Sequence, residues 1–108
     1  MNKIFYNKLV RDRIPEIIQE AGRQYEIETL SEDEYAMSLR QKLVEEAKES
    51  QKADVDDLIT ELADLYEVVD AIIAFYGLDR KQIETIQLER REKRGAFTKR
   101  IKLVWAEQ

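Results

Sequence analysis

Apolar residues recur every three or four positions through most of the chain, which is the spacing typical of amphipathic helices. Four segments with this spacing lie between signals that start and stop helices. We predict helices from about Asp12 to Ala21, from Ser31 to about Gln51, from Asp54–Asp57 to Gly77, and from Asp79 to Gly95. The pattern therefore predicts a mainly α fold, built as a four-helix bundle.

Several residues at the ends of these segments support the boundaries. Ser31, followed three residues later by Glu34, forms a capping-box pattern at the start of the second helix. Pro15 lies in the first turn of the first helix, where its missing N–H is tolerated. Gly22 and Gly77 are suited to the ends of the first and third helices.

Two short stretches alternate between polar and apolar residues, as strands do. They are Tyr25–Leu30 and Phe97–Trp105, and the alternation is compatible with a small two-stranded sheet beside the helices. The chain has 108 residues and shows no repeat and no linker-like segment. We therefore expect one domain over residues 1–108.

The third helix carries acids where its apolar face should be. Eight residues form one broad apolar stripe on that helix: Leu58, Leu62, Leu65, Val68, Val69, Ile72, Phe75 and Tyr76. Glu61 lies inside the stripe and Asp64 lies on its edge, whereas Glu67 and Asp70 point away from it. Glu61 and Asp64 thus break the binary pattern expected of a surface helix.

The second helix shows the same feature in a milder form. Glu46 borders its apolar face, and Glu49 follows three residues later on the same side. If the chain turns near Asp54, the two helices run antiparallel and the acids match in depth. Glu49 then faces Glu61, and Glu46 faces Asp64, across helices that pack about 8–10 Å apart.

Four carboxylates that converge on a partly dry groove repel one another and lose hydration. A divalent cation removes that cost, and Mg²⁺ prefers oxygen ligands. The alternative is that these acids are ordinary solvated groups paired with lysines of their own helix, namely Lys42, Lys48 and Lys52. The inward position of Glu61 favours the metal site.

Composition limits the chemistry that is available. The chain has no cysteine and no histidine, which excludes disulfides, thiolate or imidazole metal sites and histidine catalysis. The net charge of −5 argues against a nucleic-acid binder and against an anionic-membrane binder. No signal peptide or membrane-spanning run is apparent, so we expect a cytoplasmic protein.

These acidic residues resemble the motif of the all-α nucleotide pyrophosphohydrolases, the MazG-like and phosphoribosyl-ATP pyrophosphohydrolase superfamily. The family pattern is EExxE followed by ExxD, which appears here as Glu45–Glu49 and Glu61–Asp64, separated by eleven residues. That separation is at or just below the short end of the usual range. Lys8–Ile18 is similar to the N-terminal signature of one small-protein branch. Lys93–Phe97 is similar to that branch's RGGF segment, with Ala96 in place of a glycine.

The resemblance implies that Glu46, Glu49, Glu61 and Asp64 bind Mg²⁺, for which Mn²⁺ can substitute. It makes Glu45 either a further ligand or the base that orients water. The implied reaction cleaves a nucleoside triphosphate between its α and β phosphates and releases a nucleoside monophosphate and pyrophosphate. Removal of non-standard nucleotides is one role for such an enzyme.

Two cationic clusters are candidates for holding the substrate's phosphates. One contains Lys8 and Arg11, and the other contains Lys93 and Arg94 beside Gly95. For the second cluster, the alternative is that the cations complement the negative end of a helix that stops at Gly95.

The third helix also predicts self-association. Ile59, Tyr66 and Ile73 add a second apolar flank to its main stripe, which is typical of a central or interfacial helix. We expect a homodimer or a dimer of dimers built on it. Within the enzyme class, the alternative substrate is phosphoribosyl-ATP. A non-catalytic helical oligomerisation or regulatory module is the rival class, and a nucleic-acid regulator is disfavoured by the acidic balance.

Overall fold

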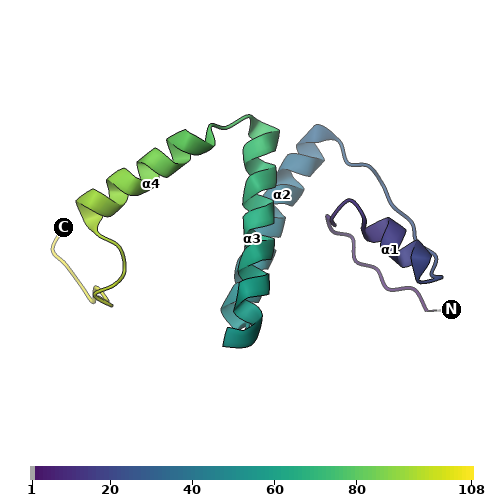
Figure 1. The fold of residues 1–108 in the computed structure, drawn as a ribbon, viewed down its shortest axis with the longest axis horizontal. Helices are drawn as coiled ribbons and strands as arrows, with labels where there is room; N and C mark the ends of the chain where they lie inside the picture. Colours follow the sequence, from purple (N-terminus) through teal and green to yellow (C-terminus); the bar gives the residue numbers. More distant parts are fainter. Residues whose placement is uncertain (1) are drawn as a thin grey trace. The chain divides into compact units, whose positions relative to one another are not determined.

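The computed structural model describes residues 2–108, and four helices lie within them (Figure 1). Their bounds are α1 Ile14–Glu20, α2 Glu32–Lys52, α3 Val55–Tyr76 and α4 Arg80–Arg94. The predicted mainly α fold with four helices is confirmed. Each helix begins and ends within about two residues of the limits that the sequence predicts.

The caps of α2 and α3 explain why the hairpin has fixed ends. Ser31 Oγ accepts the Glu34 N–H at 3.2 Å, and the Glu34 carboxylate accepts the Ser31 N–H at 3.3 Å, so the capping box is confirmed. Asp54 caps α3 by accepting the Asp57 N–H at 3.1 Å. At the other end of α3, Gly77 adopts a φ of 61°, a left-handed conformation that glycine takes without steric cost.

The outer helices end as their sequences indicate. Pro15 lies in the first turn of α1, and beyond that helix the Gly22 N–H donates to the Gln19 carbonyl at 2.9 Å. Helix α4 is capped by Asp79, whose carboxylate accepts the Lys81 N–H at 3.0 Å.

Helices α2 and α3 pack side by side as an antiparallel hairpin (Figure 1). Leu39 of α2 and Val68 of α3 are the buried apolar residues of the hairpin among the described residues. Tyr35, near the start of α2, contacts Phe75, near the end of α3, edge to face with ring centroids 5.1 Å apart. These contacts fix the register of the hairpin and thereby the depth at which its acids meet.

Neither alternating stretch forms a strand in the part of the chain that the structure describes. The expected two-stranded sheet is therefore wrong. The stretch from Phe97 to Trp105 is broken by a turn in which the Arg100 N–H donates to the Phe97 carbonyl at 3.2 Å, with Arg100 at a φ of 56°. The stretch from Tyr25 to Leu30 makes no ladder of backbone hydrogen bonds, and an isolated extended segment is not stable as a strand.

The chain forms two compact units, one ending at Gly77 and the other beginning at Leu78. The first contains the α2–α3 hairpin and therefore the candidate site. Within the second, no residue is buried by the rest of that unit, because so short a segment cannot build a core alone. The single domain over residues 1–108 stays a prediction. Across residues 2–108, no helix combines the length and apolarity needed to traverse a bilayer.

Candidate metal centre

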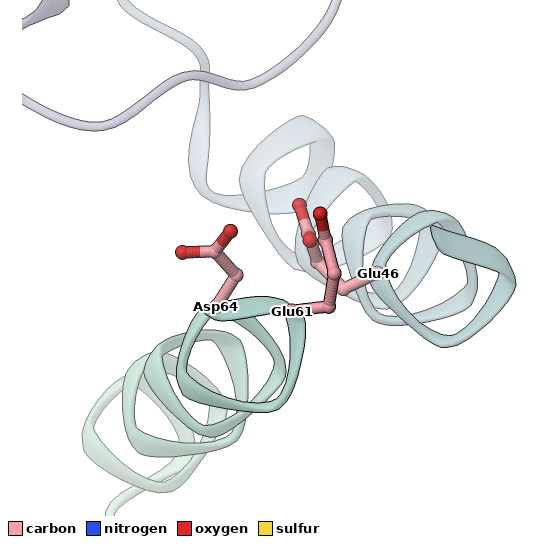
Figure 2. A group of neighbouring side chains, drawn as sticks. All are labelled: Glu46, Glu61 and Asp64. Carbon is pink, nitrogen blue, oxygen red and sulfur yellow. The ribbon is translucent and has the colours of Figure 1, made fainter. Parts of the chain in front are cut away.

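Three carboxylates meet on one side of the α2–α3 hairpin. Glu46 comes from α2, whereas Glu61 and Asp64 lie one turn apart on α3. One carboxylate oxygen of each residue lies within 4.8 Å of the corresponding oxygens of the other two. Figure 2 shows the three side chains pointing to the same side of the two helices. Glu61, predicted inside the apolar stripe, and Asp64, predicted on its edge, are both half-buried.

Burial makes this group electrostatically costly. Glu46 is only 9% exposed, although it is a carboxylate, and Glu61 and Asp64 are half-buried. Negative charges held this close in partly dry surroundings repel more strongly than they do in water. The packing of α2 against α3 holds the three acids close together, because the register that brings them together also buries Leu39 and Val68.

Nearby cations offset part of the charge on two of the three acids. The Arg11 guanidinium donates to Asp64 Oδ1 at 2.8 Å. Lys42, one turn before Glu46 on α2, lies 3.7 Å from a Glu46 oxygen. Pairing of the acids with lysines of their own helix therefore holds for Lys42, while Lys48 and Lys52 form no ion pair among the described residues.

Glu61 has no cationic partner among residues 2–108. Its pKa is raised by partial burial first, and then by the negative charges of Asp64, Glu49 and Glu46. A bound cation near this carboxylate acts in the opposite direction, because it stabilises the ionised form. Glu61 is thus the acid of the group whose charge is least compensated by the protein.

This shift predicts how the stability of the metal-free protein changes with pH. Because the pKa of Glu61 is raised above its ordinary value of 4.5, the folded chain binds this proton more readily than the unfolded chain does. The free energy of unfolding contributed by Glu61 therefore falls as the pH rises from 4.5 through the raised pKa. Glu61→Gln removes this dependence, so the stability gap between variant and wild type should widen over that window. Urea unfolding at a series of pH values, with a chelator present, measures the gap. A constant gap contradicts the prediction.

The two remaining acids of the motif lie outside the group of three. Glu49 is exposed and does not bring an oxygen within the 4.8 Å group, although its charge helps to raise the pKa of Glu61. Glu45 accepts a hydrogen bond from Lys8 at 3.0 Å and lies 3.6 Å from Lys42. The hydrogen bond from Lys8 is the main cause that lowers the pKa of Glu45. Glu45 therefore stays ionised at neutral pH.

The candidate phosphate-binding cations belong to both units. In the first unit, Lys8 pairs with Glu45 and Arg11 pairs with Asp64; the hydrogen bond to Glu45, and then the charge of Glu45, raise the pKa of Lys8. Lys93 and Arg94 lie in the last turn of α4, where they complement the negative end of the helix. The sequence reasoning missed that Arg11 pairs with Asp64. The only indication of this pair in the sequence was the run of positive residues before α1, whose charge is opposite to that of the acids on the hairpin.

The donor set suits a hard divalent ion. All three groups are carboxylates, the ligands that Mg²⁺ prefers, and Mg²⁺–oxygen distances are about 2.1 Å. Two oxygens bound to one such ion lie at most ~4.2 Å apart. One oxygen each of Glu46, Glu61 and Asp64 already lies within 4.8 Å of the others, which is close to that limit.

Comparison with known proteins gives one partial match and no function. An uncharacterized protein of Mycolicibacterium smegmatis is 52% identical over 54 residues, which is 50% of this chain and 55% of the relative. The chain thus spans about half the length of the curated relative that it matches. No family model and no solved structure matches the chain.

Proposed function

We propose that the protein is a Mg²⁺-dependent nucleoside triphosphate pyrophosphohydrolase that cleaves between the α and β phosphates. The observation that carries this proposal is the group formed by Glu46, Glu61 and Asp64 on the hairpin. The resemblance of Glu45–Glu49 and Glu61–Asp64 to the motif of the all-α pyrophosphohydrolases supports it. Non-standard nucleotides are the proposed substrate class, and the cytoplasm, where nucleotides are abundant, is the proposed location.

The residues of the site divide the work of phosphoryl transfer, which depends mainly on positioning and charge neutralisation. Glu46, Glu61 and Asp64 would hold the ion, and Glu49, whose charge acts on Glu61, would be a further ligand. When bound, Mg²⁺ lowers the pKa of a water molecule and polarises phosphoryl oxygens. Glu45, held in place by Lys8, orients the attacking water rather than acting as a strong base, because its pKa is lowered.

Positive side chains complete the proposed site. Lys8 and Arg11 lie beside the acids and are placed to meet the substrate's phosphates. Lys93 and Arg94, which lie in the second compact unit, stay predicted phosphate-binding cations of that unit, since guanidinium and ammonium groups both suit phosphate.

A panel of nucleotides incubated with the purified protein and Mg²⁺ tests the proposed reaction. The expected products are a nucleoside monophosphate and pyrophosphate, and a chelator should stop their formation. Phosphoribosyl-ATP belongs in the panel because it is the alternative substrate within the same class. Release of orthophosphate and a nucleoside diphosphate contradicts cleavage between the α and β phosphates. Absence of turnover with every nucleotide favours the non-catalytic module.

An apolar surface of α3 favours the non-catalytic oligomerisation module and is also compatible with an enzyme that forms oligomers. Residues spaced alternately three and four apart form an apolar seam along α3: Val55, Ile59, Leu62, Tyr66, Val69, Ile73 and Tyr76. Ile59 and Tyr66 are 81% and 69% exposed, and only Ile73 is half-buried. This spacing is the one with which two helices pair along a seam. We propose that two copies of the chain pair through it, as a homodimer or within a dimer of dimers.

The variant Ile59→Asp should dissociate this assembly, because it places a charge at the centre of an apolar contact. Light scattering coupled to size-exclusion chromatography should give the mass of one chain for Ile59→Asp and of two or four chains for the wild type. Val44→Asp is the matched control, since Val44 is an exposed valine of α2 outside the seam, and its assembly should not change. A wild-type protein that is already monomeric at micromolar concentration contradicts the proposal.

A further inference from the structure

The segment before α1 is tied to the hairpin by two cations. Lys8 Nζ lies 3.0 Å from Glu45 Oε1, and Arg11 Nη2 lies 2.8 Å from Asp64 Oδ1. These partners are 37 and 53 residues away in the sequence. Leu9, which lies between Lys8 and Arg11 in the sequence, is half-buried, whereas the residues from Asn2 to Lys8 are exposed. The segment is therefore attached mainly through its charges.

The two cations contact different parts of the acidic surface. Lys8 binds Glu45, which is outside the group of three close carboxylates. Arg11 binds Asp64, which is inside that group. A cation held by the group and the Arg11 guanidinium therefore compete for the same carboxylate, whereas Lys8 does not take part in this competition.

The pair formed by Arg11 and Asp64 can open without unfolding the chain. The Arg11 side chain is 57% exposed and that of Asp64 is 37% exposed, so both are reached by solvent. Exposed ion pairs contribute little to stability, and their opening exposes no core. The bond from Lys8 to Glu45 does not involve Asp64, so it stays available to the segment when Arg11 leaves Asp64.

We propose that Arg11 is an exchangeable counter-ion, which neutralises Asp64 until a divalent ion takes its place and then passes to the substrate's phosphates. Lys8 is the anchor that holds Arg11 within reach. The inference rests on the proposed function for its last step alone, since competition between the ion and Arg11 requires no hydrolysis. By linkage, the ion weakens the pair between Arg11 and Asp64 by the same factor by which that pair weakens ion binding.

Calorimetric titration with Mg²⁺ tests the exchange in Arg11→Gln. The variant should bind Mg²⁺ about two- to fivefold more tightly than the wild type, the range set by the strength of an exposed ion pair. Arg13→Gln is the matched control, because Arg13 lies two residues further on and pairs with Glu16 at 3.0 Å instead of with the hairpin. Its Mg²⁺ affinity should equal that of the wild type.

A second measurement uses the wild-type protein. The ¹⁵N signal of the Arg11 side chain, assigned by its loss in Arg11→Gln, should move towards the position of a free arginine as Mg²⁺ is added. Equal or weaker Mg²⁺ binding by Arg11→Gln, or an Arg11 signal that ignores Mg²⁺, overturns the exchange even if the enzyme hydrolyses nucleotides. Conversely, a protein that shows both effects but no hydrolysis retains the exchange and loses the proposed function.

Discussion

Glu61→Gln is expected to lower kcat/KM for nucleotide hydrolysis by about 100- to 1000-fold. A metal ion stabilises the transition state of phosphoryl transfer by several kcal/mol, and each 1.36 kcal/mol corresponds to about a tenfold change in rate. Glutamine keeps the size of the side chain but removes the negative charge, for which residues 2–108 supply no cationic partner. Steady-state release of pyrophosphate at saturating Mg²⁺ measures the change.

The control for this substitution lies on the same helix. Glu67 is an exposed glutamate of α3 outside the group of three close carboxylates, so Glu67→Gln changes the net charge equally and removes none of the group's oxygens. Its kcat/KM should remain within a factor of two of the wild-type value. A Glu61→Gln enzyme as active as Glu67→Gln removes Glu61 from the mechanism.

Mg²⁺ is expected to raise the melting temperature of the wild type and to leave that of Glu61→Gln nearly unchanged. At a free Mg²⁺ concentration 100 times its dissociation constant, binding stabilises the folded state by about 2.7 kcal/mol. For a chain of this size, that corresponds to an increase in Tm of roughly 10–20 °C. Calorimetric scans with Mg²⁺ and with a chelator measure it.

The same scans carry a second expectation for the metal-free proteins. Glu61→Gln should melt above the wild type at neutral pH, because it removes a charge that is disfavoured first by partial burial and then by repulsion from neighbouring acids, the causes that raise the pKa of Glu61. Glu67→Gln should follow the wild type, with and without Mg²⁺. If Glu61 is an ordinary solvated acid, Glu61→Gln should not raise the melting temperature of the metal-free protein, and Mg²⁺ should not change the melting temperature. That result supports the non-catalytic module.

Most of the helical structure follows from local signals in the sequence. The capping box at Ser31 and the stop at Gly77 each depend on a few neighbouring residues, and the structure places them as predicted. Asp54 caps α3 within the range predicted for the start of that helix. The stretch from Phe97 to Trp105 shows where such signals fail. Its alternation suits a strand, but a turn at Arg100 interrupts it, and strands require a partner that alternation alone does not supply.

The candidate site was predictable as far as helix geometry reaches. Helical periodicity places Glu61 on the apolar face of α3, and the turn near Asp54 sets it opposite the second helix. Periodicity does not determine side-chain rotamers, which is why Glu49 lies outside the group that Glu46 joins. The bond from Arg11 to Asp64 joins residues 53 apart, and no local pattern encodes such a contact.

Binding of Mn²⁺ to the wild-type protein, followed by electron paramagnetic resonance, tests most directly whether the hairpin acids hold a divalent ion. The wild type should show saturable binding that Mg²⁺ displaces. Glu61→Gln should bind Mn²⁺ at least about tenfold more weakly, since even loss of a group that only supports a ligand costs 10- to 100-fold in metal affinity. Glu67→Gln should bind as the wild type does. If wild type and Glu61→Gln bind Mn²⁺ equally, or neither binds it, Glu46, Glu61 and Asp64 do not form a metal centre.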